Sequence, residues 1–264
     1  MNLYIFKIVS ENYRQPLEHP PIIEAVVGFD CMMPPSYDLT SLQETAQEKL
    51  KTRYPSFRAQ HVHETELIHT GDKTPVLRNK TGLNALQFVT EDKLQLLQFH
   101  KGGFSFNRLK PYTSLDAYEV EIQEGWEIFA ELAHPESIRK LSMRNINRLM
   151  LPLKNGDVEL AEFINTAPTT PENSGLSFKN FVHQHNAWEK STGNEARIVL
   201  ASEAPEGGVL PIILDITTSR LVTLAPDETE EIEVIIESLR DLKDRVFYNS
   251  ITDSCRKLFQ QNPI

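Results

Sequence analysis

The amino-acid sequence predicts an α+β fold built from two halves that repeat one order of elements, strand, helix, meander and helix. Three observations support this prediction. Each half begins with a long apolar strand, continues through β-like segments separated by polar turns, and ends with an amphipathic helix. We expect the halves at residues 1–136 and 137–264, packed as one compact unit with mainly antiparallel sheets.

The first half is expected to hold a strand at 22–32, a helix at 40–54, strands at 57–68, 83–89, 93–99 and 103–109, and a helix at 114–133. The first of these strands is β-branched and apolar, and alternation places Val27 and Phe29 on one face and Glu24 on the other. Ser41 and Glu44 fit a capping box for the first helix. The tight polar turn at 90–92 makes the middle strands antiparallel.

The second half is expected to hold a strand at 138–153, a short helix at 158–165, strands at 176–188, 195–201 and 209–217, and helices beginning near Asp227 and Ser250. The penultimate helix carries apolar residues at helical spacing, including Ile232, Ile235 and Leu239, and Asp227 with Glu230 forms its expected cap. The order of elements in the first half therefore returns, which predicts an internal duplication.

Composition restricts the classes of function. The chain has 264 residues and a formal net charge of -10, which repels phosphate backbones and disfavours nucleic-acid binding. Its two cysteines, Cys31 and Cys255, fit no metal or disulfide spacing, which favours a reducing cytoplasm. Met1–Ser10 reads as a short strand rather than a signal peptide, and no segment reaches the roughly 18 apolar residues of a membrane span. We expect a soluble, cytoplasmic protein without a cofactor.

Four hydrogen-bonding side chains, Arg144, Asn145, Asn147 and Arg148, interrupt the apolar strand at 138–153. Alternation places the two arginines on one face of the strand and the two asparagines on the other. Such groups are costly to bury without partners. They either bind a ligand carboxylate or phosphate, together with Glu24, or pair internally within the fold.

Two His-x-His motifs lie on strands that are polar enough to be sheet edges. His61 and His63 follow the first helix, and His183 and His185 occupy the corresponding strand of the second half. Residues two apart share a strand face, so either pair offers two imidazoles to zinc, copper or nickel. The alternative is a solvated strand face with no metal.

The helix that begins near Asp227 carries an acidic face, made of Glu228, Glu230, Glu231, Glu233, Glu237 and Asp241. This face is either solvated or a docking surface for a basic partner protein. A further acid, Asp215, interrupts the apolar strand at 209–217, and we expect it to pair with Arg220 or Arg144 rather than to act in catalysis.

Several of these motifs together resemble a sporadically distributed family of uncharacterised prokaryotic proteins, over nearly the whole chain. The motifs are Leu17–Ala25 with its Pro-Pro-Ile and following Glu24, the Trp126-x-x-Phe129 helix, Met143–Arg148 and Leu214–Ile216. His19 stands where that family usually has Asn, and Asn145 where it has an aromatic residue. The resemblance implies no activity, and the family's patchy distribution implies mobile-element, toxin–antitoxin or phage-defence contexts.

The sequence favours a non-catalytic binding module that recognises a small ligand or a partner protein where Glu24, Arg144 and Arg148 converge. No nucleophile elbow, phosphate-binding loop, dinucleotide fingerprint or HExxH motif is present in the sequence. The alternatives are a metal-dependent enzyme using His61 and His63, a phosphate-handling enzyme using the arginines, and a nucleic-acid-associated protein. An edge strand or the acidic helix would also allow a homodimer.

Overall fold

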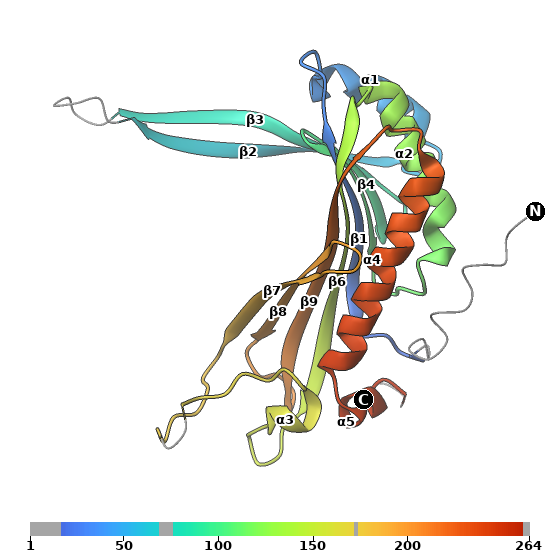
Figure 1. Ribbon diagram of the computed structural model, residues 1–264. Helices are drawn as coiled ribbons and strands as arrows, with labels where there is room; N and C mark the ends of the chain where they lie inside the picture. Colours follow the sequence, from blue (N-terminus) through green and yellow to red (C-terminus); the bar gives the residue numbers. More distant parts are fainter. Residues whose placement is uncertain (1–16, 69–75, 172–173, 261–264) are drawn as a thin grey trace, which may run out of the picture.

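The computed structural model describes residues 17–68, 76–171 and 174–260, with the backbone alone for residues 63–68 and 76–80. The strand expected near the N-terminus lies outside the described residues. The described chain forms one nine-stranded antiparallel sheet with five α-helices, which confirms the predicted α+β class (Figure 1).

The strands are β1 (Ile22–Met32), β2 (Ser56–Ile68), β3 (Val76–Val89), β4 (Gln95–His100), β5 (Gly103–Leu109), β6 (Ser137–Pro152), β7 (Val182–Glu189), β8 (Asn194–Ser202) and β9 (Val209–Leu224). The helices are α1 (Leu39–Leu50), α2 (Glu119–Ala133), α3 (Leu160–Phe163), α4 (Thr229–Ser250) and α5 (Asp253–Lys257), with a 3-10 turn η1 (Asp116–Tyr118) before α2.

The strand order β2-β3-β4-β5-β1-β6-β9-β8-β7 puts the first strand of each half at the centre of the sheet. β1 and β6 pair antiparallel, with Val26 opposite Arg144 and Gly28 opposite Ser142. Each meander returns its last strand beside its first, because β5 pairs with β1 and β9 pairs with β6. The strands of both halves therefore belong to one continuous sheet rather than to two.

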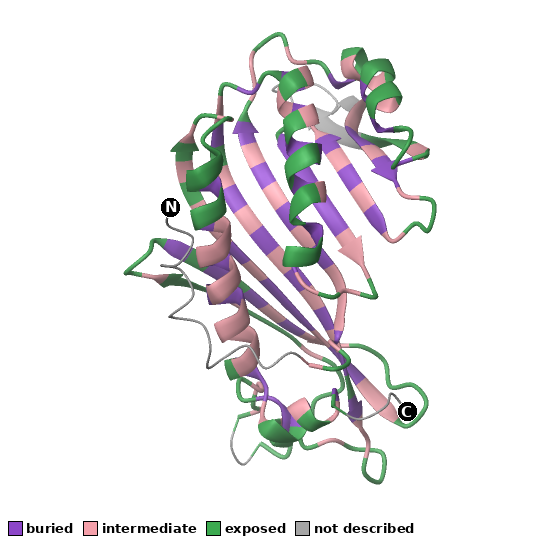
Figure 2. Ribbon diagram, turned by 90° about the vertical axis from the view of Figure 1, so that its right-hand side faces the viewer, coloured by how far each residue is buried: buried purple, intermediate pink, exposed green. Residues whose placement is uncertain are grey.

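The helices pack on one face of the sheet. In Figure 1, α2 and α4 lie on the same side of the strands, while the β2–β3 hairpin and the β7 end of the sheet project to the other side. Figure 2 looks onto the helices and shows strand residues alternating between buried and half-buried positions beneath them. We call the side under the helices the covered face and the opposite side the open face.

The covered face contains two hydrophobic clusters of different chemistry. The first is aromatic: Phe29 of β1 stacks on Trp126 of α2 with ring centroids 4.6 Å apart, and Phe129 meets Phe99 edge-on at 5.1 Å. The second is mainly aliphatic and lies under α3 and α5, where it includes Leu149, Leu151, Leu200, Ile212, Leu214, Ile216 and Cys255. The aromatic cluster anchors α2, and α4 spans from it toward the aliphatic one.

Gly125 lets α2 approach the strands closely. A Cβ atom at this position would lie 2.9 Å from Leu97 Cδ2 and 3.1 Å from Phe104 Cζ. Contacts this short require a neighbouring side chain to move, so a larger residue would lift α2 from the aromatic cluster.

The ends of several elements differ from the sequence predictions. The cap of α1 is Asp38, whose side chain accepts a hydrogen bond from the Thr40 amide at 3.1 Å, so the predicted Ser41–Glu44 capping box is wrong. The predicted cap at Asp227 and Glu230 is wrong as well, because Glu228 occupies the N-cap position of α4 and makes no side-chain capping bond. β9 continues to Leu224, beyond the predicted end, because pairing with β6 stabilises its polar second half.

Two further features bear on the earlier expectations. Among the described residues, no helix is both long and apolar enough to span a bilayer. Cys31 and Cys255 are free, buried thiols, and burial raises the pKa of each to about 12. Thiols held in this neutral form are poor nucleophiles.

Candidate functional site

The open face carries a row of amide side chains that runs across neighbouring strands. Gln87 of β3 donates from Nε2 to Gln98 Oε1 of β4 at 2.8 Å, and Gln98 donates in turn to Asn107 Oδ1 of β5 at 3.0 Å. Asn107 Nδ2 then donates to Glu24 Oε1 of β1 at 2.8 Å, while Ser105 also contacts Asn107 Oδ1 at 3.2 Å. We call Gln87, Gln98, Asn107 and Glu24 the amide row. Each polar group in it is fixed by its neighbour, so the row is ordered by contacts within the chain.

A charged pair continues this polar band on the next strands. Arg144 of β6 donates two hydrogen bonds to Asp215 of β9, from Nε at 2.8 Å and from Nη2 at 2.7 Å. Asp215 is nearly buried, with 10% of its side chain exposed, whereas 40% of the Arg144 side chain is exposed. Arg197 of β8 approaches the same carboxylate at 3.8 Å. The hydrogen bonds that Arg144 donates to Asp215 raise the pKa of Arg144, so its guanidinium stays charged. The predicted Arg144–Asp215 pairing is confirmed.

Arg148 lies further along the open side of β6 and holds two acids from the segment around the β8–β9 turn. Its Nε donates to Glu203 and its Nη2 donates to Glu206, each at 2.7 Å. Both carboxylates are largely exposed, as is part of the guanidinium. These hydrogen bonds raise the pKa of Arg148. The interaction is a surface clamp on a turn rather than a buried ion pair.

The structure divides the five residues predicted to bind a ligand. Glu24, Arg144 and Arg148 share the open face of the two central strands, as alternation predicts, although each already has a protein partner. Asn145 and Asn147 lie on the covered face, where both are buried. The five residues therefore do not surround one common cavity.

Asn145 and Asn147 line a cavity of about 290 Å³ beneath α4. Asn147 Nδ2 donates to the Leu214 carbonyl at 2.9 Å. In the orientation that satisfies both amide atoms, Asn145 accepts from Lys243 Nζ at 3.2 Å and donates to the Arg144 carbonyl at 3.0 Å. Lys243, only 5% exposed, also donates to Asp244 at 2.5 Å. Asn145 thus ties a buried ammonium group of α4 to the centre of the sheet, while Asn147 bonds to the backbone of β9.

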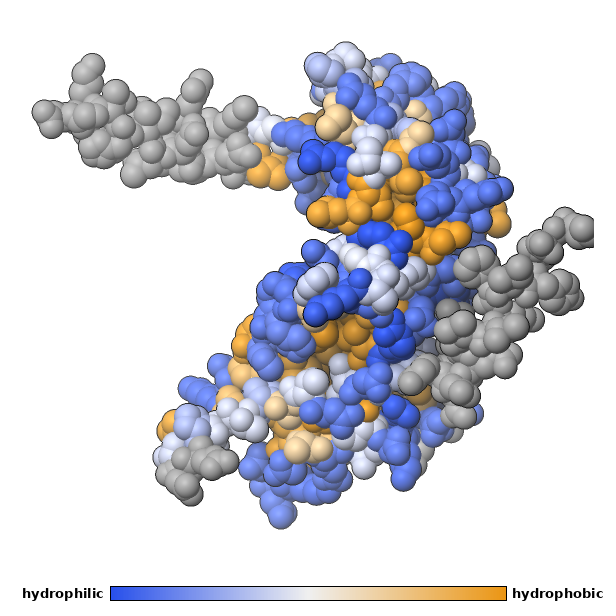
Figure 3. Space-filling model, viewed as in Figure 1, coloured by the Kyte–Doolittle hydropathy of each residue, from blue (hydrophilic) through white to orange (hydrophobic). Residues whose placement is uncertain are grey.

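The open face also exposes large apolar side chains on its second half. Trp188 of β7 is 66% exposed and Leu221 of β9 is 74% exposed. Strand register places both on the open face, since Trp188 pairs with Glu195, which pairs with Ser219. Val182 and Met150 are exposed on the same side. Figure 3 shows hydrophobic surface in two areas, below the β2–β3 hairpin and in the lower half of the molecule, with hydrophilic side chains between them.

The histidine motifs lie on the two edge strands, as expected. His61 is exposed on β2, and the side chain of His63 lies outside the described residues. The rings of His183 and His185 on β7 are 5.5 Å apart and face the covered side, opposite Leu200 and Ile198. The group of three potential metal ligands found in the described chain is a different one, Asp116, Glu119 and Glu237.

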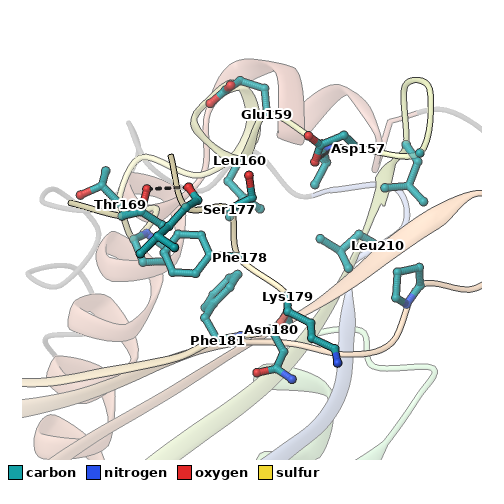
Figure 4. A pocket seen from close by; sticks show the side chains of 18 residues that line it. Asp157, Glu159, Leu160, Thr169, Ser177, Phe178, Lys179, Asn180, Phe181 and Leu210 are labelled. Atoms are coloured by element: carbon teal, nitrogen blue, oxygen red, sulfur yellow. Dashed lines mark hydrogen bonds between the residues drawn. The ribbon is translucent and has the colours of Figure 1, made fainter. Parts of the chain in front are cut away.

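A larger cavity of about 530 Å³ lies at the far end of the second half, between the segment before β7 and the start of α3. Figure 4 shows Phe178 and Phe181 at its wall, with Leu160 and Leu210 across from them and Asp157 and Glu159 at its margin. Its lining contains no histidine and no cysteine. The arrangement offers an apolar wall with two carboxylates at its margin.

Sequence reasoning missed the amide row and the exposed Trp188. When each strand is considered alone, its pattern gives no special role to Gln87, Gln98 or Asn107, because polar residues are common on the solvent-facing side of a strand. Their alignment depends on the register of three strand pairs. Polar residues at the outward positions of successive strands were the available signal.

The fold and these surfaces define a single-sheet α+β protein with one helix-covered face and one open face that combines a polar band with exposed apolar side chains on its second half. Comparison of the chain with family models, with curated proteins and with solved structures found no match.

Proposed function

We propose that this protein is a non-catalytic binding module that holds a partner protein on the open face of its sheet. One observation carries the proposal: the exposed side chains of Trp188 and Leu221 adjoin a fixed polar band that contains Arg144 and Arg197. Tryptophan, methionine and arginine are enriched in protein interfaces, and tryptophan and arginine dominate their binding energy.

The geometry favours a protein over a small ligand. The cavities at the α3 end, beneath α4 and between α2 and α4 are lined by other residues than Glu24, Arg144 and Arg148. Small-molecule sites are concave and enclose most of the ligand surface. A broad face with exposed apolar side chains and ordered polar groups suits a second macromolecular surface better.

The charges favour a protein over a phosphate group or nucleic acid. Arg144 and Arg148 already hold the carboxylates of Asp215, Glu203 and Glu206, so a phosphate would have to displace them. The net charge of -10 opposes approach of a polyanion. These facts argue against the phosphate-handling and nucleic-acid alternatives. The metal-dependent alternative keeps its own test, which is metal analysis of the purified protein and of His61→Ala.

Site-specific photo-crosslinking tests the proposal in the native host. A photoreactive amino acid at Ser219, on the open face, should capture one protein, and the same group at Glu127, on the outer side of α2, should not. Trp188→Ala combined with Leu221→Ala should then weaken binding of the purified partner at least tenfold. The matched control is Val234→Ala, which removes an exposed apolar side chain from α4. Equal loss in both variants would contradict the proposal, and capture of a second copy would replace the hetero-partner with a homodimer.

The resemblance noted from the sequence suggests where to look for the partner. We propose that it is encoded next to this chain, in a toxin–antitoxin or phage-defence setting. Co-expression with each neighbouring gene, followed by the Trp188 and Leu221 test, separates a true partner from incidental capture. If none of the proteins encoded by neighbouring genes binds, the proposed toxin–antitoxin or phage-defence setting is contradicted. The crosslinking experiment would still decide whether the open face is the binding surface.

We further propose that the two halves arose by duplication. The support is the shared order β1–α1–meander–α2 and β6–α3–meander–α4, with both meanders closing beside their first strand. Superposition of the halves should match β1 to β6 and β5 to β9 through a rotation close to a half-turn. A best superposition that pairs other strands would refute this relation.

A further inference from the structure

A second surface lies on the opposite side of the sheet, between α2 and α4. Figure 2 shows both helices crossing the covered face with strands visible between them, and a cavity of about 510 Å³ occupies this position. Its floor is apolar and contains Phe29, Trp126, Ile122 and Ile232. The indole N–H of Trp126 already donates to the Pro226 carbonyl at 3.1 Å, so the ring presents only apolar surface. We call this space the α2–α4 groove.

Carboxylates surround this apolar floor. Asp116, Glu119, Glu233 and Glu237 all line the α2–α4 groove. Arg240, a cation of the same lining, donates to Asp116 at 2.5 and 2.8 Å and to Glu237 at 3.0 Å. Within the described residues, Glu119 and Glu233 form no ion pair. The groove therefore places two carboxylates that lack an ion pair in the described chain beside an apolar floor whose four side chains are each less than 10% exposed.

The pKa of Glu119, whose carboxyl group lines the groove, reflects its burial and its charged neighbours. Burial raises the pKa of Glu119, the neighbouring carboxylates of Asp116, Glu237 and Glu233 raise it further, and Arg240 opposes the shift only in part. A cation brought close to Glu119 would relieve this repulsion. A bound metal ion is the less suitable cation, because Arg240 already occupies the space between Asp116 and Glu237.

We propose that the α2–α4 groove binds a basic amphipathic segment of a partner protein. One apolar side chain of that segment would enter over Trp126 and Ile232, and flanking lysine or arginine side chains would pair with Glu119 and Glu233. Amphipathic segments bind grooves between helices in this way, and complementary charge selects the partner. This surface is separate from the open face, so the two proposals stand or fall independently.

A fluorescent 16-residue helical peptide of leucine and lysine is a suitable probe, with a leucine–glutamate peptide as its counterpart. Anisotropy should show binding of the basic peptide alone. Glu119→Gln combined with Glu233→Gln should weaken binding about tenfold and reduce its salt dependence. The matched control, Glu127→Gln with Glu231→Gln, removes the same charge from the same helices outside the groove and should change affinity less than about twofold.

A second pair of variants tests the apolar part of the groove. Val120→Ser, at a 59% exposed position on the rim, should weaken binding several-fold, and Val234→Ser on α4 should leave it unchanged. Equal effects of the groove and control variants would show attraction to the acidic protein in general and would overturn the proposal. The parent protein could instead self-associate without binding the peptide, and the Glu119–Glu233 variant could lose that self-association. This result would assign the groove to a second copy of the chain and would also overturn the proposal. Trp188→Ala with Leu221→Ala should not alter peptide binding.

Discussion

The two faces of the sheet are built from the same strands but differ in the side chains they carry and in how those side chains are buried. The covered face buries aromatic and aliphatic side chains under the helices, as at Phe99 and Leu141. The open face orders polar groups through the amide row and the Arg144–Asp215 pair and leaves Trp188 and Leu221 exposed. The difference teaches that strand alternation separates the side chains that pack under the helices from those that face away from them, so a substitution on one face should leave the packing of the other largely unchanged.

The largest expected effect is on the covered face. Phe129 is fully buried among Phe99, Phe104 and Trp126, so Phe129→Ala should lower the free energy of unfolding by about 3–5 kcal/mol. Trp188→Ala on the open face should change it by less than about 0.5 kcal/mol. Urea denaturation followed by circular dichroism measures both. A comparable loss at Trp188 would mean that the open face also supports the fold.

The next largest effect is a difference in stability between substitutions of two arginines on the open side of β6. Arg144→Ala leaves the nearly buried Asp215 carboxylate without its two strong hydrogen bonds and should lower stability by about 1–3 kcal/mol. Arg148→Ala breaks contacts with exposed acids and should lower stability by less than about 1 kcal/mol. Denaturant midpoints with unchanged slopes give the two values. The reverse ranking would show that the turn clamp, and not the central pair, holds the strands.

A smaller effect concerns cooperation within the amide row. Asn107→Ala should lower stability by about 1–2 kcal/mol, because Asn107 bonds to both Gln98 and Glu24. A double-mutant cycle with Gln98→Ala should show a coupling energy of about 0.5 kcal/mol or more. The control cycle combines Asn107→Ala with Arg148→Ala, which share no hydrogen-bond partner, and should be additive. Additivity in both cycles would mean that the row does not act as a unit.

The smallest expected effect is a pH dependence on the open face. Burial lowers the pKa of His100, while nearby Asp30, itself paired with Lys140, opposes the shift. The unfolded chain therefore takes up a proton first as pH falls through about 6.5, so stability decreases between that pH and the lower folded-state pKa. His100→Gln should remove this slope. Melting temperatures from about pH 8 to pH 5 measure it, and an unchanged slope in the variant would assign the dependence to another group.

The sequence by itself determined the elements and their faces. Alternation in β1 and β6 correctly placed Glu24, Arg144 and Arg148 on one side and the asparagines on the other. The Arg144–Asp215 pair was also predictable, because two opposite charges in apolar strands require partners. Helix caps were predicted less well, since Asp38 competes with Ser41 for the same turn and local geometry decides between them.

Only the tertiary structure decided which surfaces these faces form. The amide row exists because β3, β4, β5 and β1 pair in one register, and register depends on contacts between residues distant in sequence. Alternation separates Arg144 from Asn145, but which of the two lies under α4 depends on where that helix packs, and periodicity does not specify this. The α2–α4 groove depends on the spacing of two helices that are about a hundred residues apart in the chain. Local patterns fix the direction of a side chain, whereas its neighbours are fixed by long-range packing.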